Sequence, residues 1–417
     1  MKICIFTNHF YPEDFKVNDI AFELANKGHS ISVVTAVPDY PKGSFFPGYG
    51  IFRRCREMVN QCKVYRLPII PRGKGSAVRL VINYISFFLS SSVFTFFHKY
   101  FHKYDAVFVH LTSPFFIGTC AAKLKKWQKI PMIFWVLDLW PESLTAAAGI
   151  TNSLILKPQI KMVKKVYSCS DKILIGSKGF EKSICQKGGF HQKLEYFPNW
   201  AESVDSFTVP AKNYQTDFLN SFESTDFVIL FAGNLGESQN LDCVLDVAVE
   251  LRDIKSIKFV FIGDGRARAH LVNRVQENAI TNTVFFPGRF PLEYMPYFMS
   301  KADVLLVSLK DEPIFNLTVP SKVQFYMAQG KPILAMLNGD GYDLVTEAQC
   351  GISVPANNKT AFMAAITKLS KMNSDELKTL GANGKLYYQN NFTKEQRIEQ
   401  LCTILDNMNS CKTYTCK

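Results

Sequence analysis

Residues 227–236 read FVILFAGNLG, an apolar run of β-type residues that ends in a turn containing two glycines. An apolar run without polar alternation is typical of a strand that is buried on both faces of a parallel sheet. The residues that follow place Leu241, Val244, Leu245 and Ala248 at helical spacing. The stretch therefore predicts a strand, a glycine turn and a helix, the repeating unit of α/β proteins.

The same alternation recurs on both sides of this stretch. Further buried strands are predicted at residues 2–7, 31–34, 106–109, 131–136, 173–175, 258–262, 284–286, 304–307 and 333–335. The periodicity lapses between about residues 200 and 225, which we interpret as a linker. A chain of 417 residues also exceeds what a single core normally supports. We therefore expect an α/β protein with two doubly wound, Rossmann-like domains, residues 1–200 and 201–390, facing across a ligand-binding cleft.

The composition excludes several classes of protein. A hydrophobic share of 47%, with 23 Gly and 19 Pro, is not that of a disordered or fibrous chain. Eleven scattered cysteines form no C-x-x-C pair, and the apolar run at the N-terminus is too short for a signal peptide. We therefore expect a reduced, cytosolic protein.

The positive charge is confined to the first half of the chain. The net charge is +12, but residues 1–200 carry 27 basic and 12 acidic residues, whereas residues 201–417 carry 21 and 24. Such a field attracts anionic lipids, nucleic acids or phosphorylated substrates. Nucleic acid is disfavoured, because bulky apolar segments interrupt the basic residues and no nucleic-acid module is recognised.

Residues 80–97, LVINYISFFLSSSVFTFF, form an apolar segment with no charged residue. Its length is that of a membrane-spanning helix, but Asn, Ser and Thr interrupt it and basic residues flank both ends. A spanning helix, a core helix and a helix lying on a bilayer surface are all compatible with this pattern. The surface helix fits best, because it accommodates both the polar interruptions and the flanking charges.

Two glycine turns and one helix start are candidate binding elements. Gly233, Asn234 and Gly236 follow a strand, where glycine allows close backbone approach and helix N–H groups favour phosphate, although an ordinary turn would have the same residues. Gly263 begins a second turn, GDG, which we expect to line the nucleotide cleft. Residues 319–332 read VPSKVQFYMAQGKP. Here Pro320 and Ser321 start a helix whose positive end presents Ser321 and Lys322 to a diphosphate.

These motifs together resemble the GT-B glycosyltransferases of family 4. The supporting stretches are FYPE (10–13), PDYPKG (38–43), DLWPES (138–143), YFPNW (196–200), GNLG (233–236), GDG (263–265), FPGR (286–289) and PSK to GKP (320–332). Those of the first domain are similar to the bacterial O-antigen subgroup that includes N-acetyl-L-fucosaminyl transferases. The resemblance extends from residue 1 to about residue 405.

The resemblance implies a division of labour between the two domains. It implies a C-terminal domain that binds a sugar nucleotide, an N-terminal domain that binds a lipid-linked acceptor, and retention of anomeric configuration. It also implies that the last segment, residues 391–417, is a helix that packs back on the N-terminal domain. The protein is then expected to be peripheral on the cytoplasmic face of the inner membrane.

The sequence departs from the family at positions that matter for the donor. The family's paired glutamates are replaced by Leu317 and Phe325, and its diphosphate-binding Arg and Lys by Asn234 and Gln239. Charge neutralisation must therefore come from elsewhere. Lys322, helped by helix N–H groups and by Arg289, is our candidate, and a solvated helix-start lysine is the alternative.

The sequence contains neither a D-x-D motif nor a cluster with metal-ligand spacing, so we expect a metal-independent enzyme without a cofactor. Asp138 follows a strand at its carboxyl end, and we expect it, with Glu142 second, to act as the acceptor-side base or orienting group. The alternative is that Asp138 caps the following helix. His110, also at a strand end, is a weaker candidate.

The sequence favours a glycosyltransferase that moves N-acetyl-L-fucosamine from its UDP form to a lipid-diphosphate-linked saccharide during O-antigen or capsule assembly. Two alternatives stay open. One is a sugar-nucleotide epimerase of the same fold, which the basic, apolar segment from Arg53 to Lys103 disfavours. The other is a non-catalytic glycosyltransferase-like subunit, with which the missing glutamates agree.

Overall fold

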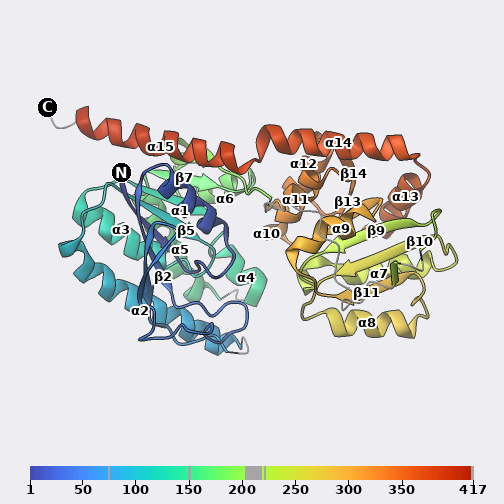
Figure 1. Cartoon of the computed structure of the whole chain (residues 1–417), viewed down its shortest axis with the longest axis horizontal. Helices are drawn as coiled ribbons and strands as arrows, with labels where there is room; N and C mark the ends of the chain where they lie inside the picture. Colours follow the sequence, from blue (N-terminus) through green and yellow to red (C-terminus); the bar gives the residue numbers. More distant parts are fainter. Residues whose placement is uncertain (74–75, 149–151, 202–217, 220–221, 415–417) are drawn as a thin grey trace. The chain divides into compact units, whose positions relative to one another are not determined.

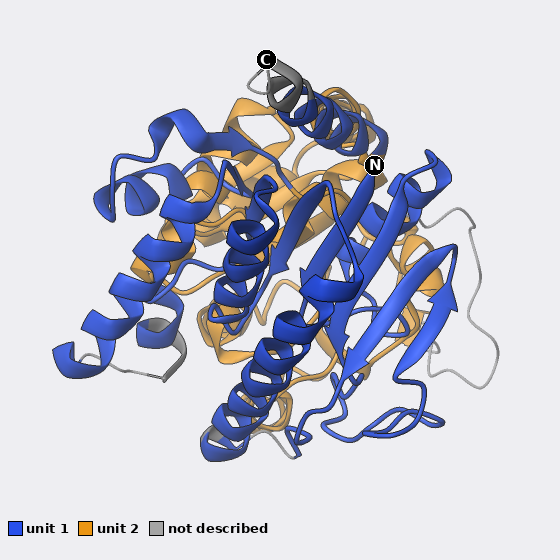
Figure 2. Cartoon of the chain, turned by 90° about the vertical axis from the view of Figure 1, so that its left-hand side faces the viewer, with its two compact units in different colours: residues 1–198, 395–417 blue, residues 199–394 orange. Residues whose placement is uncertain are grey.

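The chain divides into two compact units in the computed structural model, which describes residues 1–73, 76–148, 152–201, 218–219 and 222–414. Unit 1 comprises residues 1–198 and 395–417, and unit 2 comprises residues 199–394 (Figures 1 and 2). Most of the predicted linker, residues 202–217 and 220–221, lies outside the described residues. Each unit contains one sheet of its own.

Unit 1 is built on an eight-stranded sheet with the order β3-β4-β2-β1-β5-β6-β7-β8. Its strands are β1 (Lys2–Thr7), β2 (Ser30–Ala36), β3 (Arg56–Val59), β4 (Cys62–Leu67), β5 (Ala106–Leu111), β6 (Met132–Val136), β7 (Lys172–Ile175) and β8 (Leu194–Tyr196). All neighbouring strands are parallel except β3, which pairs antiparallel with β4 at one edge. The strand order reverses between β1 and β5, so the carboxyl ends of these strands form the switch point where ligands bind in such sheets.

Helices cover the sheet of unit 1. They are α1 (Lys16–Asn26), α2 (Ala77–Phe101), α3 (Ile117–Gln128), α4 (Glu142–Ala148), α5 (Ser153–Cys169), α6 (Phe180–Gln186), the 3₁₀ turn η1 (His191–Lys193) and α15 (Lys394–Tyr414). From residue 395 onward α15 belongs to this unit. Its residue Gln400 donates a hydrogen bond of 3.0 Å to the carbonyl oxygen of Tyr196. Leu401 and Leu405 of the same helix are buried.

Unit 2 is built on a six-stranded parallel sheet with the order β11-β10-β9-β12-β13-β14. Its strands are β9 (Phe227–Ala232), β10 (Ile257–Ile262), β11 (Val284–Gly288), β12 (Val304–Ser308), β13 (Ile333–Met336) and β14 (Gly351–Val354). Its helices are η3 (Glu237–Gln239), α7 (Leu241–Glu250), α8 (Arg268–Glu277), η4 (Leu292–Tyr294), α9 (Met295–Ser300), α10 (Pro313–Asn316), α11 (Ser321–Gln329), α12 (Asp340–Glu347), α13 (Lys359–Ser370) and α14 (Ser374–Asn391). The switch point lies between β9 and β12, directly after the stretch that predicted the fold.

Helix α2 exposes more apolar surface than a helix of a water-soluble protein normally does. Its buried positions include the polar residues Asn83, Ser91 and Thr95, each at most 2% exposed. Phe87 is buried beside them, but many other large apolar residues of the helix are exposed, and these are Val78, Val81, Ile82, Ile85, Leu89, Val93, Phe96, Phe97, Tyr100 and Phe101. Residues 78–101 are also long and apolar enough to cross a membrane, with a mean hydropathy of 1.7. A helix that faced only water would not normally expose so many large apolar side chains.

Candidate functional site

The glycine turns of unit 2 are in direct backbone contact at the carboxyl ends of β9 and β10. Gly233 N donates to Ile262 O at 2.8 Å, and Leu235 N donates to Asp264 O at 2.9 Å. Gly263 has a φ of +142°, and a Cβ built on it would lie 1.8 Å from Gly233 O. Glycine at 263 therefore allows the two turns to close on each other.

Lys322, in the first turn of α11, reaches the turn that follows β9. Its Nζ donates a hydrogen bond to Gln239 Oε1 and lies 4.4 Å from the centroid of the Phe231 ring. A Cβ built on Gly233 would lie 2.6 Å from the lysine Cε. The fold thus brings three predicted donor residues, Gly233, Gln239 and Lys322, into contact.

The charge on Lys322 has no counterion among the described residues. Burial lowers the pKa of its ammonium group from the ordinary 10.5 to about 8, and no charged neighbour contributes to this change. A buried cation is normally paired. An unpaired ammonium beside glycine turns at a sheet's switch point is suited to receive an anion such as a diphosphate.

The predicted start of α11 is confirmed. Pro320 precedes the helix in an extended conformation, Ser321 is the first helical residue, and Gly330 ends the helix with a φ of +67°. The helix N-terminus therefore presents free backbone N–H groups next to Lys322. Phe325 lies on the same helix and is 9% exposed, so an apolar ring occupies this position of the missing glutamate pair.

The other predicted donor residues lie in or after the same turns. A Cβ built on Gly236 would lie 2.7 Å from Asn234 Nδ2, so this glycine makes room for the asparagine side chain. Arg289 follows β11 directly and is exposed. It has no ion pair with a described residue, and it is not brought into contact with Lys322.

Asp138 lies in unit 1 just beyond the carboxyl end of β6. Ser113 Oγ donates to Asp138 Oδ2 at 3.1 Å, and Trp140 Nε1 donates to Ser113 Oγ at 3.2 Å. Burial raises the pKa of the Asp138 carboxyl to about 6, although the Ser113 hydrogen bond opposes this change. No described backbone amide of α4 donates to this carboxylate. A carboxyl group that titrates near neutral pH at a strand end can act as a general base.

Glu142 and His110 have other surroundings. Glu142 Oε1 forms an ion pair of 2.5 Å with Lys187 Nζ and accepts from Ser183 Oγ at 2.7 Å, which ties α4 to α6. His110 is 2% exposed and bonds Thr7 Oγ1 at 3.1 Å. Burial lowers the pKa of His110 to about 3, so its ring is neutral at physiological pH. Neither side chain is hydrogen-bonded to Asp138.

A buried polar network near the switch point of unit 1 is absent from the sequence-derived site. Glu13 accepts from His9 Nδ1 at 2.8 Å and from the backbone N–H of Tyr40 at 2.7 Å. Arg72 Nη2 lies 3.2 Å from His9 Nε2, and Arg72 Nε lies 3.2 Å from Asp39 Oδ1. A guanidinium only donates, so His9 Nε2 accepts and its Nδ1 carries the proton. The motifs FYPE and PDYPKG contain Glu13 and Asp39 and were the available signal.

This network contacts the partner of Asp138 and the start of α2. Asn8 Nδ2 donates to the Ser113 carbonyl at 2.9 Å and lies 3.2 Å from His9 Nε2. Asn83 of α2 donates to Asp39 Oδ2 at 3.1 Å. The loops that follow β1, β2, β4 and β5 are therefore held together by side chains.

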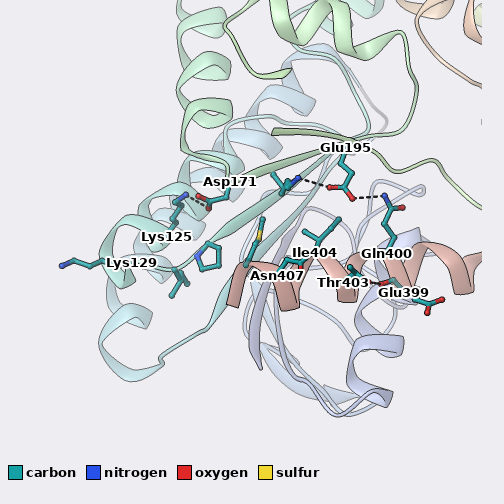
Figure 3. Close-up of a pocket in the computed structure, with 13 residues that line it drawn as sticks. Lys125, Lys129, Asp171, Glu195, Glu399, Gln400, Thr403, Ile404 and Asn407 are labelled. Carbon is teal, nitrogen blue, oxygen red and sulfur yellow. Dashed lines mark hydrogen bonds and ion pairs between the residues drawn. The ribbon is translucent and has the colours of Figure 1, made fainter. Parts of the chain in front are cut away.

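A cavity of about 920 Å³ in unit 1 lies at the amino ends of the strands, opposite the carboxyl ends described above (Figure 3). It is lined by residues at the amino ends of β6 and β7, including Pro131 and Asp171, and by α15. Glu195 joins its walls through Lys172 Nζ at 3.2 Å and Gln400 Nε2 at 3.2 Å. Parallel sheets bind substrates at the carboxyl ends of strands, so we do not assign this cavity to the site.

The sequence is similar to those of known glycosyltransferases. Residues 215–387 match the family model described as "Glycosyl transferases group 1". The "Probable glycosyltransferase WbjE" of Pseudomonas aeruginosa is 29% identical over 281 residues, covering 65% of this chain and 68% of the relative. The "Putative colanic acid biosynthesis glycosyl transferase WcaI" of Escherichia coli is 25% identical over 346 residues, covering 79% and 82%.

The fold is shared with solved glycosyltransferases. Sucrose-phosphate synthase from Thermosynechococcus elongatus superposes with a TM-score of 0.72 over 98% of this chain and 99% of that one, at 17% sequence identity. The predicted GT-B fold class is therefore confirmed. The chain is a two-domain protein of GT-B fold, and its residues 215–387 are similar to the domain of the glycosyltransferase group 1 family.

Proposed function

We propose that this protein transfers a sugar from a nucleotide-sugar donor to a lipid-diphosphate-linked saccharide during O-antigen or capsule assembly. The donor is UDP-N-acetyl-L-fucosamine, an assignment that rests on the resemblance of the FYPE, PDYPKG and DLWPES motifs. The observation that carries the transferase assignment is the unpaired ammonium of Lys322 beside the glycine turns. The relative named for colanic acid biosynthesis supports a role in surface polysaccharide assembly.

The residues of unit 2 perform the donor half of the reaction. Lys322 Nζ and the first N–H groups of α11 bind the diphosphate and stabilise the negative charge that grows on it as the glycosidic bond breaks. The glycine turns admit the diphosphate close to the backbone, because glycine has no side chain to hold it away. Retention of configuration is the outcome expected of this family.

The residues of unit 1 perform the acceptor half. Asp138 accepts the proton of the attacking hydroxyl group, for which a carboxyl pKa of about 6 is suitable, because the group is ionised at pH 7 yet basic enough to take a proton. Ser113 positions the carboxylate through its 3.1 Å hydrogen bond. Glu142 is the second candidate base, and it is paired with Lys187.

The exposed apolar surface of helix α2 supports the proposed membrane partner. Lys99 of α2 lies 4.0 Å from the ring centroid of Trp127 on α3, and that indole is 40% exposed. Next to α3, helix α5 exposes Leu154 and Ile155 together with several lysines, which are Lys157, Lys161, Lys164 and Lys165. Exposed apolar side chains combined with lysines are the composition of a surface that binds anionic bilayers. We therefore assign the protein to the cytoplasmic face of the inner membrane as a peripheral protein.

A donor panel tests this function. The purified protein is incubated with UDP-sugars and other nucleotide sugars, first without acceptor and then with a lipid-diphosphate-linked saccharide, and release of nucleoside diphosphate is measured. We expect slow donor hydrolysis alone and faster transfer with acceptor. Full turnover in both Lys322→Ala and Asp138→Ala would refute the proposed site. Absence of hydrolysis across the whole panel would instead identify a non-catalytic subunit.

A further inference from the structure

A second pocket of unit 1 lies at the β3 edge of the sheet, and Asp138 is not among the residues that line it. Its volume is about 550 Å³, within the range of small-ligand sites. Its walls come from the loop after β1, from residues 46–49 and from the β3 strand, and include Tyr11, Phe46, Tyr49, Arg54 and Glu57. The first of these loops also carries Asn8, whose amide bonds the carbonyl of Ser113.

The pocket combines aromatic walls with an excess of positive charge. Tyr11 is 47% exposed, so one of its ring surfaces is available to a ligand. Arg54 lies 5.1 Å from the centroid of the Tyr49 ring, and no described carboxylate pairs with it. Glu57, the carboxylate of the pocket wall, is already engaged by Arg66, at 2.7 Å from Nε and 2.5 Å from Nη2.

Arg66 provides a second, independent observation. Its side chain is fully buried and contacts the pocket-lining residues: its Nη2 donates to the Tyr11 carbonyl at 2.5 Å, and its Cζ lies 4.8 Å from the Tyr49 ring centroid. Its remaining terminal nitrogen, Nη1, is buried without a hydrogen-bond partner in the described structure. Glu57 is therefore already paired with Arg66, Arg54 has no carboxylate partner among the described residues, and one buried N–H donor of Arg66 is unsatisfied.

We propose that this pocket binds an acidic sugar residue of the acceptor glycan. An exposed tyrosine ring suits the apolar face of a pyranose, and the planar guanidinium of Arg54 suits a carboxylate, which it can bind through two parallel N–H bonds. The pocket then recognises a uronic acid unit some distance from the hydroxyl group that reacts. This inference rests on the proposed function, because it makes the pocket a subsite for the acceptor.

Ligand-observed NMR on the full-length protein without donor tests the subsite separately from transfer. The probes are methyl glucuronide, methyl glucoside and inorganic phosphate. Methyl glucuronide should bind at least about tenfold more tightly than methyl glucoside, a difference of about 1.4 kcal/mol, and phosphate should not displace it at equal concentration. Equal binding of the two glycosides, or displacement by phosphate, would overturn the proposal.

The variants use two adjacent arginines as a matched pair. Arg54→Gln should weaken methyl glucuronide binding about tenfold, whereas Arg53→Gln removes the same charge from an exposed neighbour outside the pocket wall and should change it less than twofold. Tyr11→Leu should weaken both glycosides. Equal effects of Arg54→Gln and Arg53→Gln would show general charge attraction and refute the subsite. Donor hydrolysis, measured in parallel, should be unchanged in all three variants, so failure of the subsite is distinct from failure of the transferase assignment.

Discussion

Replacing Lys322 by methionine should stabilise unit 2 at neutral pH while removing most of the turnover. The ammonium is held in a place that lowers its pKa from 10.5 to about 8, which corresponds to about 3 kcal/mol at roughly 1.4 kcal/mol per pH unit. The lost hydrogen bond to Gln239 offsets about 1 kcal/mol of this gain. Methionine keeps the aliphatic contact with Phe231. The expected net gain at pH 7 is about 2 kcal/mol.

The pH dependence of this gain identifies its cause. Between pH 8 and 10.5 the unfolded chain binds the Lys322 proton more tightly than the folded chain, so wild-type stability rises with pH across this window. The advantage of Lys322→Met should therefore shrink by about 2 kcal/mol between pH 7 and pH 9.5.

Urea unfolding of both proteins at the two pH values measures this difference, and Lys310→Met, at an exposed lysine of the same unit, serves as the control. Donor turnover should fall about 100-fold or more in Lys322→Met. A pH-independent difference, or destabilisation at pH 7, would refute the reasoning.

Three further predictions concern the glycine turns, the proposed base and the apolar helix. Gly263→Ala should lower the free energy of unfolding by about 3 kcal/mol or more, because its Cβ would meet backbone at 1.8 Å. Gly288→Ala, with open space around it, should lower it by about 1 kcal/mol. Similar unfolding midpoints of the two variants in urea would contradict this. Asp138→Asn should reduce turnover about 100-fold or more. It should also remove the acidic limb near pH 6 from the pH profile of kcat/KM, since the carboxyl must be ionised to accept a proton. If the limb persisted in the variant, another group would be responsible for it. The double variant Leu89→Asp with Phe97→Asp should abolish flotation with anionic liposomes, and Ile254→Asp, at an exposed apolar residue of unit 2, should not. Flotation of the double variant would exclude α2 from the bilayer contact.

Most strands of both sheets were predictable because they are buried on both faces. Runs such as 3–6 and 227–231 are apolar throughout, and a parallel sheet covered by helices requires this. The edge strands β8 and β14, which are only partly buried, were missed. The hairpin of β3 and β4 was missed. Lys63 and Arg66 interrupt β4, and the charge of Arg66 is accommodated by Glu57 and the Tyr49 ring. Only the folded chain brings these partners to the arginine.

The residues of the candidate site were predictable where they belong to a single loop or to the start of a single helix. Lys322 and the glycines at 233 and 263 belong to local turns whose shape follows from nearby residues. The network of His9, Glu13, Asp39 and Arg72 was not predictable as a site, because its members lie on loops after different strands. Each member alone is an ordinary polar loop residue, and their proximity follows from strand order.

By itself, the sequence determined the α/β class, the two sheets and the apolar character of residues 80–97, since these depend on periodicity and on residue type within short windows. The tertiary structure decided which face of α2 is buried and which surroundings raise or lower the pKa of each titratable group. It also brought Lys322 to Gln239, which lies 83 residues away in the sequence. These outcomes depend on desolvation and on contacts between distant segments. Local pattern contains no information on either until strand order has placed the loops side by side.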